Sequence, residues 1–171
     1  MINDRLSELR DYPFGRLNAL LDGIDPAPGA GPDGASIIMS IGEPGHAFPD
    51  MVTTLLADNA ALWRKYPPIG GTADLRAAIA DWLTRRYELQ PGMVTAEHHV
   101  LPVAGTREAL FTIALAAVPT EKAGKRPVAL IPDPFYQVYV GAAIMAGAEP
   151  VFVPTTAATG FLPDFAALPD D

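Results

Sequence analysis

The chain has 171 residues, 49% of them hydrophobic, a length that suits one domain with a buried core. It carries 12 basic against 20 acidic side chains, a formal net charge of −8, and the scattered basic residues argue against a nucleic-acid partner. The absence of cysteine excludes disulfides and thiolate metal sites, and it agrees with a cytoplasmic location.

The first third of the chain reads as short elements separated by loops. Residues 1–22 predict a short helix with an arm; their charged, amphipathic start is not a secretory signal. A loop rich in proline and glycine follows over residues 23–36, and a strand is expected around 37–41. Pro49 fits the first turn of a helix that runs to about Trp63.

The remainder alternates between helices and strands. Thr72 is the expected N-cap of a helix with apolar residues spaced for one face, at Leu75, Ile79, Trp82 and Leu83. Strands are then predicted over 98–103, 127–132 and 150–154, helices over 105–118 and 135–148, and the start of a further helix after residue 160. The continuous aliphatic strands indicate an α/β fold: a doubly wound, mostly parallel sheet with helices on both faces. The longest apolar stretch, near Phe111 to Val118, is too short to span a membrane.

Ligands of such sheets bind beyond the carboxyl ends of the strands, where the sequence offers two adjoining features. After the strand over 98–103, Gly105, Thr106 and Arg107 open a helix whose unpaired amides could receive an anion. An ordinary strand-to-helix turn is the alternative, and neither a Walker loop nor GxGxxG is present.

The second feature is the aromatic cluster that follows the strand over 127–132. Tyr136 lies where its face could cover a planar ring, although Phe135, Tyr136 and Tyr139 could instead pack into the core. An anion-binding helix start beside an aromatic ring that could cover a ligand suits a phosphorylated, flat heteroaromatic molecule.

Two loops before these features could also contribute to a site. Tyr66, held between Lys65 and Pro67, could present its hydroxyl to a partner or pack in the loop. Gly42 could expose its amide to a substrate carboxylate or simply form a turn. His98 and His99 are adjacent on a predicted strand and point to opposite faces, so no metal site is expected.

Four motifs follow one another along the chain: SIGEPGH, KYPPIGGTADLRAAIADWL, VLPVAGTREALF and DPFYQVYVGAAIMAGA. They resemble the N-terminal part of the class I/II pyridoxal-phosphate-dependent aminotransferases, of the aspartate aminotransferase fold type. The resemblance covers nearly the whole chain and is closest to the bacterial succinyldiaminopimelate transaminases. It implies an N-terminal arm and linker over 1–35, a segment on the substrate side over 36–50, and the first part of the large cofactor domain over 51–171.

The resemblance implies roles for the candidate residues. Tyr136 would stack on the ring of pyridoxal 5'-phosphate, and the turn at Gly105, Thr106 and Arg107 would receive its phosphate. Tyr66 would reach the cofactor of the other subunit of a homodimer, and Gly42 would contact the substrate. The N-terminal arm would pack on the partner subunit.

The implied reaction is amino transfer between glutamate or 2-oxoglutarate and N-succinyl-diaminopimelate, in lysine and diaminopimelate biosynthesis. The lysines Lys65, Lys122 and Lys125 do not lie in the family's Ser-x-x-Lys context. The Schiff-base lysine is therefore expected beyond residue 171, and the chain alone is expected to be inactive. The alternatives are a class I aminotransferase of aspartate, alanine or aromatic specificity, and a non-catalytic fragment or dimerisation module.

Overall fold

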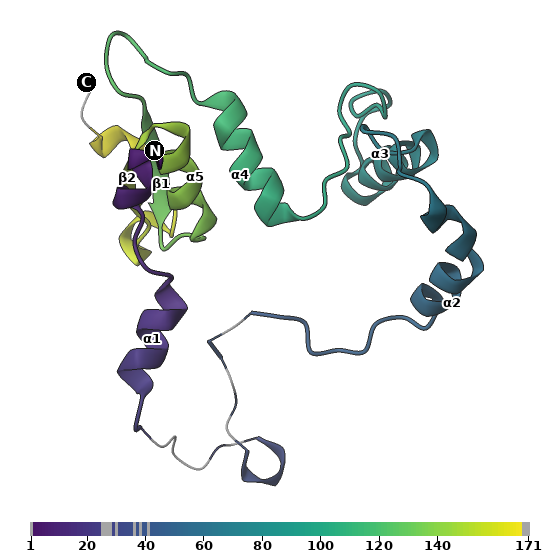
Figure 1. Ribbon diagram of the computed structural model, residues 1–171, viewed down its shortest axis with the longest axis horizontal. Coiled ribbons are helices and arrows are strands. Elements are labelled where there is room, and N and C mark those ends of the chain that lie inside the picture. Colours follow the sequence, from purple (N-terminus) through teal and green to yellow (C-terminus); the bar gives the residue numbers. More distant parts are fainter. Residues whose placement is uncertain are drawn as a thin grey trace. The chain divides into compact units, whose positions relative to one another are not determined.

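Two compact units make up the chain in the computed structural model (Figure 1), which describes residues 2–24, 29, 31–35, 37, 39–40 and 42–168. One unit combines the N-terminal stretch Met1–Asp22 with Val103–Asp171, and the other is Gly23–Pro102. The division into 1–35, 36–50 and 51–171 that the resemblance implies stays a prediction. Each unit is described by itself below.

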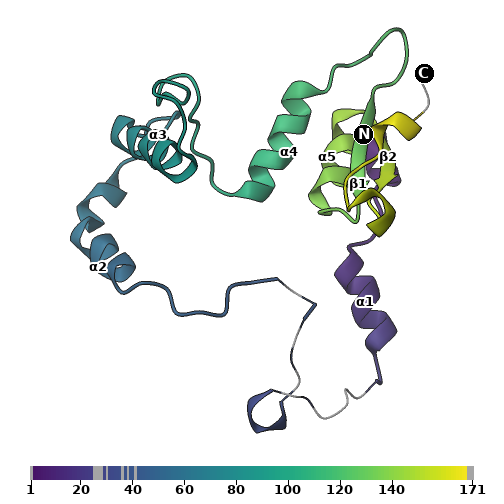
Figure 2. The same cartoon turned by 180° about the vertical axis from the view of Figure 1, so that it is seen from behind.

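The first unit contains a parallel pair of strands joined by a helix. Strand β1 (Val128–Asp133) pairs with β2 (Glu149–Pro154) in a register that runs from Val128 opposite Glu149 to Asp133 opposite Pro154. Helix α5 (Val138–Ala146) connects them, and the strands lie side by side in both views (Figure 1 and Figure 2). The expected parallel α/β arrangement and the two strands near 127–132 and 150–154 are confirmed.

A small core forms where α5 lies against this sheet. Ile131 of β1, Ala143 of α5 and Ala148 are buried together, with Val118, Ala129 and Val140 packed against them. Small side chains on α5 let its backbone approach the strands closely, so alanines fill the space that larger residues fill elsewhere. Helix α4 (Thr106–Ala117), predicted over 105–118, contacts α5.

Helix α5 begins later than the predicted residue 135. Residues Phe135 to Gln137 precede the helix, and the amide of Tyr139 donates to the carbonyl of Tyr136 at 3.0 Å. Tyr136 therefore lies between the end of β1 and the start of α5, at the carboxyl end of the strand. At this position the Tyr136 side chain can reach Arg107 of α4.

The N-terminal stretch folds onto this same unit. It consists of a 3-10 helix, η1 (Asp4–Glu8), and helix α1 (Pro13–Leu21), which agrees with the short helix expected before residue 22. Pro13 occupies the first turn of α1, where a missing amide proton has no consequence. Element η1 contacts α5 of its own chain. The predicted contact of the arm with a partner subunit stays a prediction.

The second unit contains α2 (Met51–Asp58), the 3-10 helix η3 (Ala60–Arg64) and α3 (Ala73–Tyr87). The N-cap at Thr72 is confirmed, because its hydroxyl accepts the amide of Leu75 at 3.3 Å. The single helix predicted from Pro49 to Trp63 is interrupted at Asn59. The backbone and side-chain amides of Asn59 both donate to the carbonyl of Leu55, at 3.2 and 2.9 Å, and the backbone of Asn59 has left helical geometry, with φ of −102° and ψ of 15°.

Two strand predictions and one helix prediction did not hold. Residues 98–103 are not a strand: they have no ladder partner in the described part of the chain, and Pro102 has no amide to donate. Of the strand expected at 37–41, residues 38 and 41 lie outside the described residues, and 37, 39 and 40 are not in a strand. After residue 160 the described part of the chain forms a single short 3-10 helix, η5 (Phe165–Ala167). No helix found in the described ranges has the length and apolar character needed to cross a membrane.

Candidate functional site

Arg107 and Tyr136 meet where α4 begins and β1 ends. The guanidinium Nε of Arg107 donates to the hydroxyl of Tyr136 at 2.9 Å. Its Cζ atom lies 5.9 Å from the centroid of the Tyr136 ring, within the range of a cation–π contact. The structure thus brings together two of the residues that sequence reasoning singled out.

The N-terminus of α4 offers amides without a side-chain cap. Gly105 is the N-cap residue and has extended backbone, and no side chain accepts from the first turn of the helix. The opening amides of a helix have no intrahelical acceptor, and the helix dipole makes their end positive. The turn at Gly105, Thr106 and Arg107 can therefore bind an anion.

Glu108 lies over this turn. A Cβ atom on Gly105 would come within 2.6 Å of the Glu108 Oε2 atom, so the carboxylate covers the N-cap. A negative side chain in the first turn stabilises the helix, but it competes with a bound anion for the same amides. A phosphate at the turn requires the Glu108 side chain to rotate away, which its exposed position and flexible stem permit.

Tyr12 completes the same region, and sequence reasoning did not identify it. A cavity of about 130 Å³ is lined by Tyr12, Arg107, Tyr136, Gln137 and Val138. Tyr12 precedes Pro13 at the start of α1, in the segment YPFGRL. An aromatic residue before a helix-starting proline was the available signal, but nothing local in the sequence relates it to residue 107.

The charge of Arg107 is reinforced by its neighbours. The pKa of Arg107 is raised, first by the hydrogen bond to Tyr136 and then by the electrostatic effects of the Tyr136 and Tyr12 oxygens. An arginine is protonated at physiological pH even without such a shift, so the guanidinium places a positive charge beside the cavity.

The aromatic cluster divides between packing and the site. Phe135 stacks on Phe152 of β2, with ring centroids 5.0 Å apart and an angle of 27° between the ring planes. Its ring therefore packs against the sheet, the alternative to a role in ligand binding. Tyr136 is 40% exposed and meets Tyr139 edge-on at 5.8 Å, while its hydroxyl faces Arg107. Of the three rings, Tyr136 has the setting expected of a lid over a ligand.

These residues fit the phosphate and ring of a cofactor such as pyridoxal 5'-phosphate. The uncapped amides at Thr106 and Arg107 match the phosphate, and a fixed positive charge stands next to them. The partly exposed face of Tyr136 matches a planar heterocycle. The roles assigned to Gly105, Thr106, Arg107 and Tyr136 themselves stay predictions.

Tyr66 and Gly42 belong to the second unit. The Tyr66 side chain is fully exposed in the loop between η3 and α3, and a Cβ atom on Gly42 would meet no atom within 4 Å. Both positions are open, as contacts with another subunit or a substrate would require. Their predicted roles are not tested by this geometry.

The three lysines of the chain lie in loops or turns of the two units. Lys122 and Lys125 exchange two backbone hydrogen bonds of 3.0 Å in a turn before β1, and Lys65 precedes Tyr66 in the second unit. None of the described residues that line the cavity is a lysine.

Comparison with known proteins relates the chain to one family. Residues 37–171 match the family model described as aminotransferase class I and II. An LL-diaminopimelate aminotransferase of Desulforudis audaxviator is 34% identical over 96% of this chain and 39% of its own length. The enzyme of the same name from Moorella thermoacetica is also 34% identical, over 98% of this chain and 40% of its own length.

Solved structures give the same picture. An aminotransferase from Neisseria meningitidis superposes with a TM-score of 0.84 and 36% identity, over 99% of this chain and 41% of the other. A single mutant of Thermus thermophilus aspartate aminotransferase, at 24% identity and a TM-score of 0.72, shares the fold over 96% of this chain and 40% of its own. The chain thus spans about two fifths of the length of the proteins it matches.

Proposed function

This chain belongs to the class I and II aminotransferases, and from that premise we propose that the whole protein transfers amino groups between amino acids and 2-oxo acids. Its α/β fold with a parallel sheet is the aspartate aminotransferase fold, and pyridoxal 5'-phosphate is the cofactor that the family implies. The observation that carries the proposal is the pairing of Arg107 with Tyr136 at the uncapped start of α4.

The residues of this chain would hold and orient the cofactor. The amides at the start of α4 would bind its phosphate, and Glu108 would turn away to admit it. Tyr136 would cover one face of the ring, held in place through its hydroxyl by Arg107. When bound, pyridoxal 5'-phosphate withdraws electron density from the substrate α-carbon so that its proton can leave.

We propose a diaminopimelate-type substrate, in lysine and diaminopimelate biosynthesis. The motifs of the sequence favour the N-succinyl compound, with glutamate or 2-oxoglutarate as the second pair. The names of the relatives at 34% identity favour LL-diaminopimelate as a second candidate. The two compounds differ at the distal amino group, which is charged in LL-diaminopimelate and acylated, with an added carboxylate, in the succinyl form.

We also propose that the active site belongs to a cytoplasmic homodimer, in which Tyr66 reaches the cofactor of the partner subunit and Gly42 contacts the substrate. Their open positions support this assignment. The motif resemblance from which both roles come supports it as well.

The substrate proposal is tested by assaying the longer protein that contains this chain. N-succinyl-diaminopimelate and LL-diaminopimelate are compared as amino donors with 2-oxoglutarate, and aspartate, alanine and phenylalanine serve as controls. We expect the highest kcat/KM for the succinyl compound. A preference for LL-diaminopimelate would select the second candidate, and a preference for one of the controls would contradict both.

The cofactor site is tested by Tyr136→Ala, which removes the ring that would cover the cofactor. We expect pyridoxal 5'-phosphate affinity to fall by about 2- to 13-fold, because an aromatic stacking contact contributes about 0.5–1.5 kcal/mol. Absorbance titration of the longer protein measures this. Tyr87→Ala is the control, since Tyr87 belongs to the second unit and is not among the described residues that line the cavity. Equal affinities for wild type and Tyr136→Ala would remove Tyr136 from the site.

A further inference from the structure

We propose that Arg126 is a positioning residue: acting through Glu8, it holds the N-terminal stretch so that Tyr12 lines the cavity beside Arg107 and Tyr136. The inference rests on the proposed function only in so far as that cavity serves the reaction. The positioning itself can be measured without any activity.

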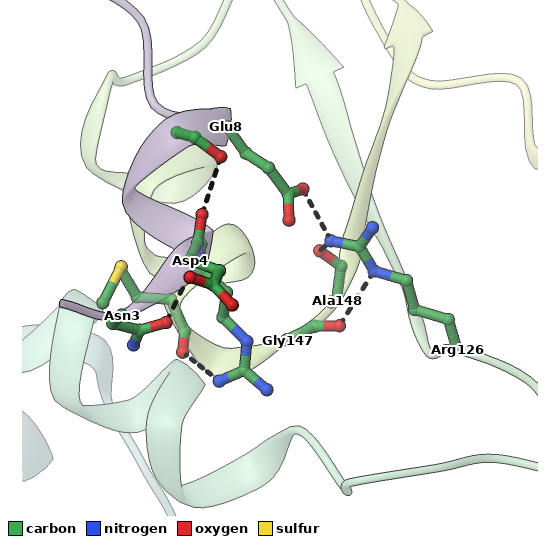
Figure 3. A network of polar contacts seen from close by, with 9 residues as sticks. Asn3, Asp4, Glu8, Arg126, Gly147 and Ala148 are labelled. Atoms are coloured by element: carbon green, nitrogen blue, oxygen red, sulfur yellow. Dashed lines mark hydrogen bonds and ion pairs between the residues drawn. The ribbon is translucent and has the colours of Figure 1, made fainter. Parts of the chain in front are cut away.

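Arg126 binds three groups from two distant parts of the chain (Figure 3). Its Nε donates to the carbonyl of Gly147 at 3.0 Å, and its Nη2 donates to the carbonyl of Ala148 at 3.0 Å. The same Nη2 forms an ion pair with Glu8 Oε2 at 2.9 Å. One guanidinium therefore ties η1 to the segment between α5 and β2.

A second arginine anchors η1 to the same helix end. Arg5 Nη1 donates to the carbonyl of Met145 at 3.1 Å, so it satisfies one of the terminal carbonyls of α5. The amide of Arg5 is itself bound by the side chain of Asn3 at 3.1 Å, which caps η1. Two cations thus meet the negative end of α5, where the helix dipole favours them.

Apolar burial contributes little to holding this stretch. Neither η1 nor α1 contains a buried residue, and Leu6 and Leu9 are exposed. A hollow of about 530 Å³ lies between residues of 8–16 and residues of α5 and β2, so the two are not closely packed. The polar contacts of Arg126 and Arg5 are therefore the principal tether.

The tether acts close to Tyr12. Glu8 ends η1 and lies one short connection before Tyr12, whose ring packs against Phe14 at 5.4 Å. Fixing Glu8 on Arg126 therefore limits where Tyr12 can lie. Because Arg126 and Glu8 are 43% and 41% exposed, their attraction is partly screened by solvent and salt.

The experiment follows Tyr12 directly, in the 171-residue chain labelled with 3-fluorotyrosine. The chain contains five tyrosines, and Tyr12→Phe assigns the ¹⁹F resonance of Tyr12. Glu8→Gln removes the ion pair and leaves the bonds from Arg126 to Gly147 and Ala148 in place. We expect the Tyr12 resonance to move toward its value in a peptide of residues 1–13, while that of Tyr87, in the second unit, stays unchanged.

Amide hydrogen exchange gives the second readout. For residues 4–12 we expect exchange about two- to fivefold faster in Glu8→Gln, the range that corresponds to loss of an exposed ion pair. Salt at 0.5 M should accelerate exchange in the wild type and have no such effect in Glu8→Gln. Arg126→Gln should give a larger acceleration than Glu8→Gln, and Glu8→Asp should restore part of the wild-type behaviour. Glu121→Gln is the control, because Glu121 forms no ion pair within the described residues.

An unchanged Tyr12 resonance in Glu8→Gln would overturn the inference. That variant keeps the backbone contacts of Arg126, so this outcome is decisive even if Arg126→Gln does not fold. In the longer protein, Glu8→Gln should raise KM with kcat nearly unchanged, whereas a general loss of stability would lower both activity and yield. If the longer protein showed no transamination, the proposed function would fail, and the fluorine and exchange results would still decide the role of Arg126.

Discussion

Gly147 shows how a single glycine can end a helix and leave nearby carbonyl groups free to accept hydrogen bonds from another part of the chain. It closes α5 in a left-handed conformation with φ of 95°, and the amide of Ala148 then reaches the carbonyl of Ala143 at 2.9 Å. The reversal leaves the carbonyls of Gly147 and Ala148 to Arg126. A Cβ atom at this position would also come within 2.9 Å of the Arg5 guanidinium.

Gly147→Ala should therefore lower the free energy of unfolding by about 1–2 kcal/mol, the cost of a left-handed conformation for a residue with a Cβ atom. Urea denaturation followed by far-ultraviolet circular dichroism measures it. Gly141→Ala, inside α5, is the matched control: a Cβ atom there meets nothing within 4 Å. Because alanine is the better helix former, this control should stabilise by about 0.5–1 kcal/mol. Equal effects of both substitutions would contradict this explanation of the α5 terminus.

Sequence reasoning related Arg107 to Tyr136 through a rule that connects distant positions, and their roles in the site stay predictions. Ligand sites in parallel sheets lie beyond the strand ends, and this rule singled out Arg107 and Tyr136, which the structure brings into contact. Tyr12 was not found, because its approach depends on the fold of η1 against α5 and on Arg126. Such contacts between remote positions leave no periodicity in a single sequence.

At the scale of elements, local sequence signals predicted helices more accurately than strands. Helices α3 and α4 were predicted because a helix forms its own hydrogen bonds, so its apolar pattern is enough to indicate it. For α3, the N-cap at Thr72 was a further local signal. Strand formation needs a neighbouring strand, so residues 98–103 looked like a strand by composition and yet are not one. The helix expected through Asn59 is interrupted there by a change of backbone conformation that no apolar pattern reveals.

The cap of α3 can be tested by Thr72→Ala. Loss of the bond from the Leu75 amide to the Thr72 hydroxyl should lower the free energy of unfolding by about 1 kcal/mol, the usual effect of removing an N-cap. Urea denaturation followed by tryptophan fluorescence measures it, since Trp82 lies within α3.

Thr84→Ala serves as the control on the same helix. The Thr84 hydroxyl donates back to the carbonyl of Ala80 at 2.9 Å, a bond that adds little to a helix interior, and alanine has the higher helix propensity. We expect a change near zero or slightly stabilising. A larger loss at Thr84 than at Thr72 would show that capping does not govern the stability of α3.

At the scale of the whole molecule, the chain spans about two fifths of the relatives it matches, and the described lining of its cavity contains no lysine. We therefore predict that the 171-residue chain with pyridoxal 5'-phosphate has no transaminase activity with any donor in the panel above. A coupled assay for glutamate formation measures turnover. The longer protein, assayed at equal concentration, is the positive control. Turnover by the 171-residue chain would contradict the prediction.

The ion pair between Glu8 and Arg126 joins positions 118 residues apart in sequence, and this separation has a consequence for biosynthesis. At roughly 5–20 residues per second, a ribosome needs about 6–24 s to make Arg126 after it has made Glu8. During that interval the first twenty residues have emerged, but their docking surface does not yet exist. The start of the chain thus reaches its final place only after Arg126 has been made, and the nascent polypeptide must keep it available until then.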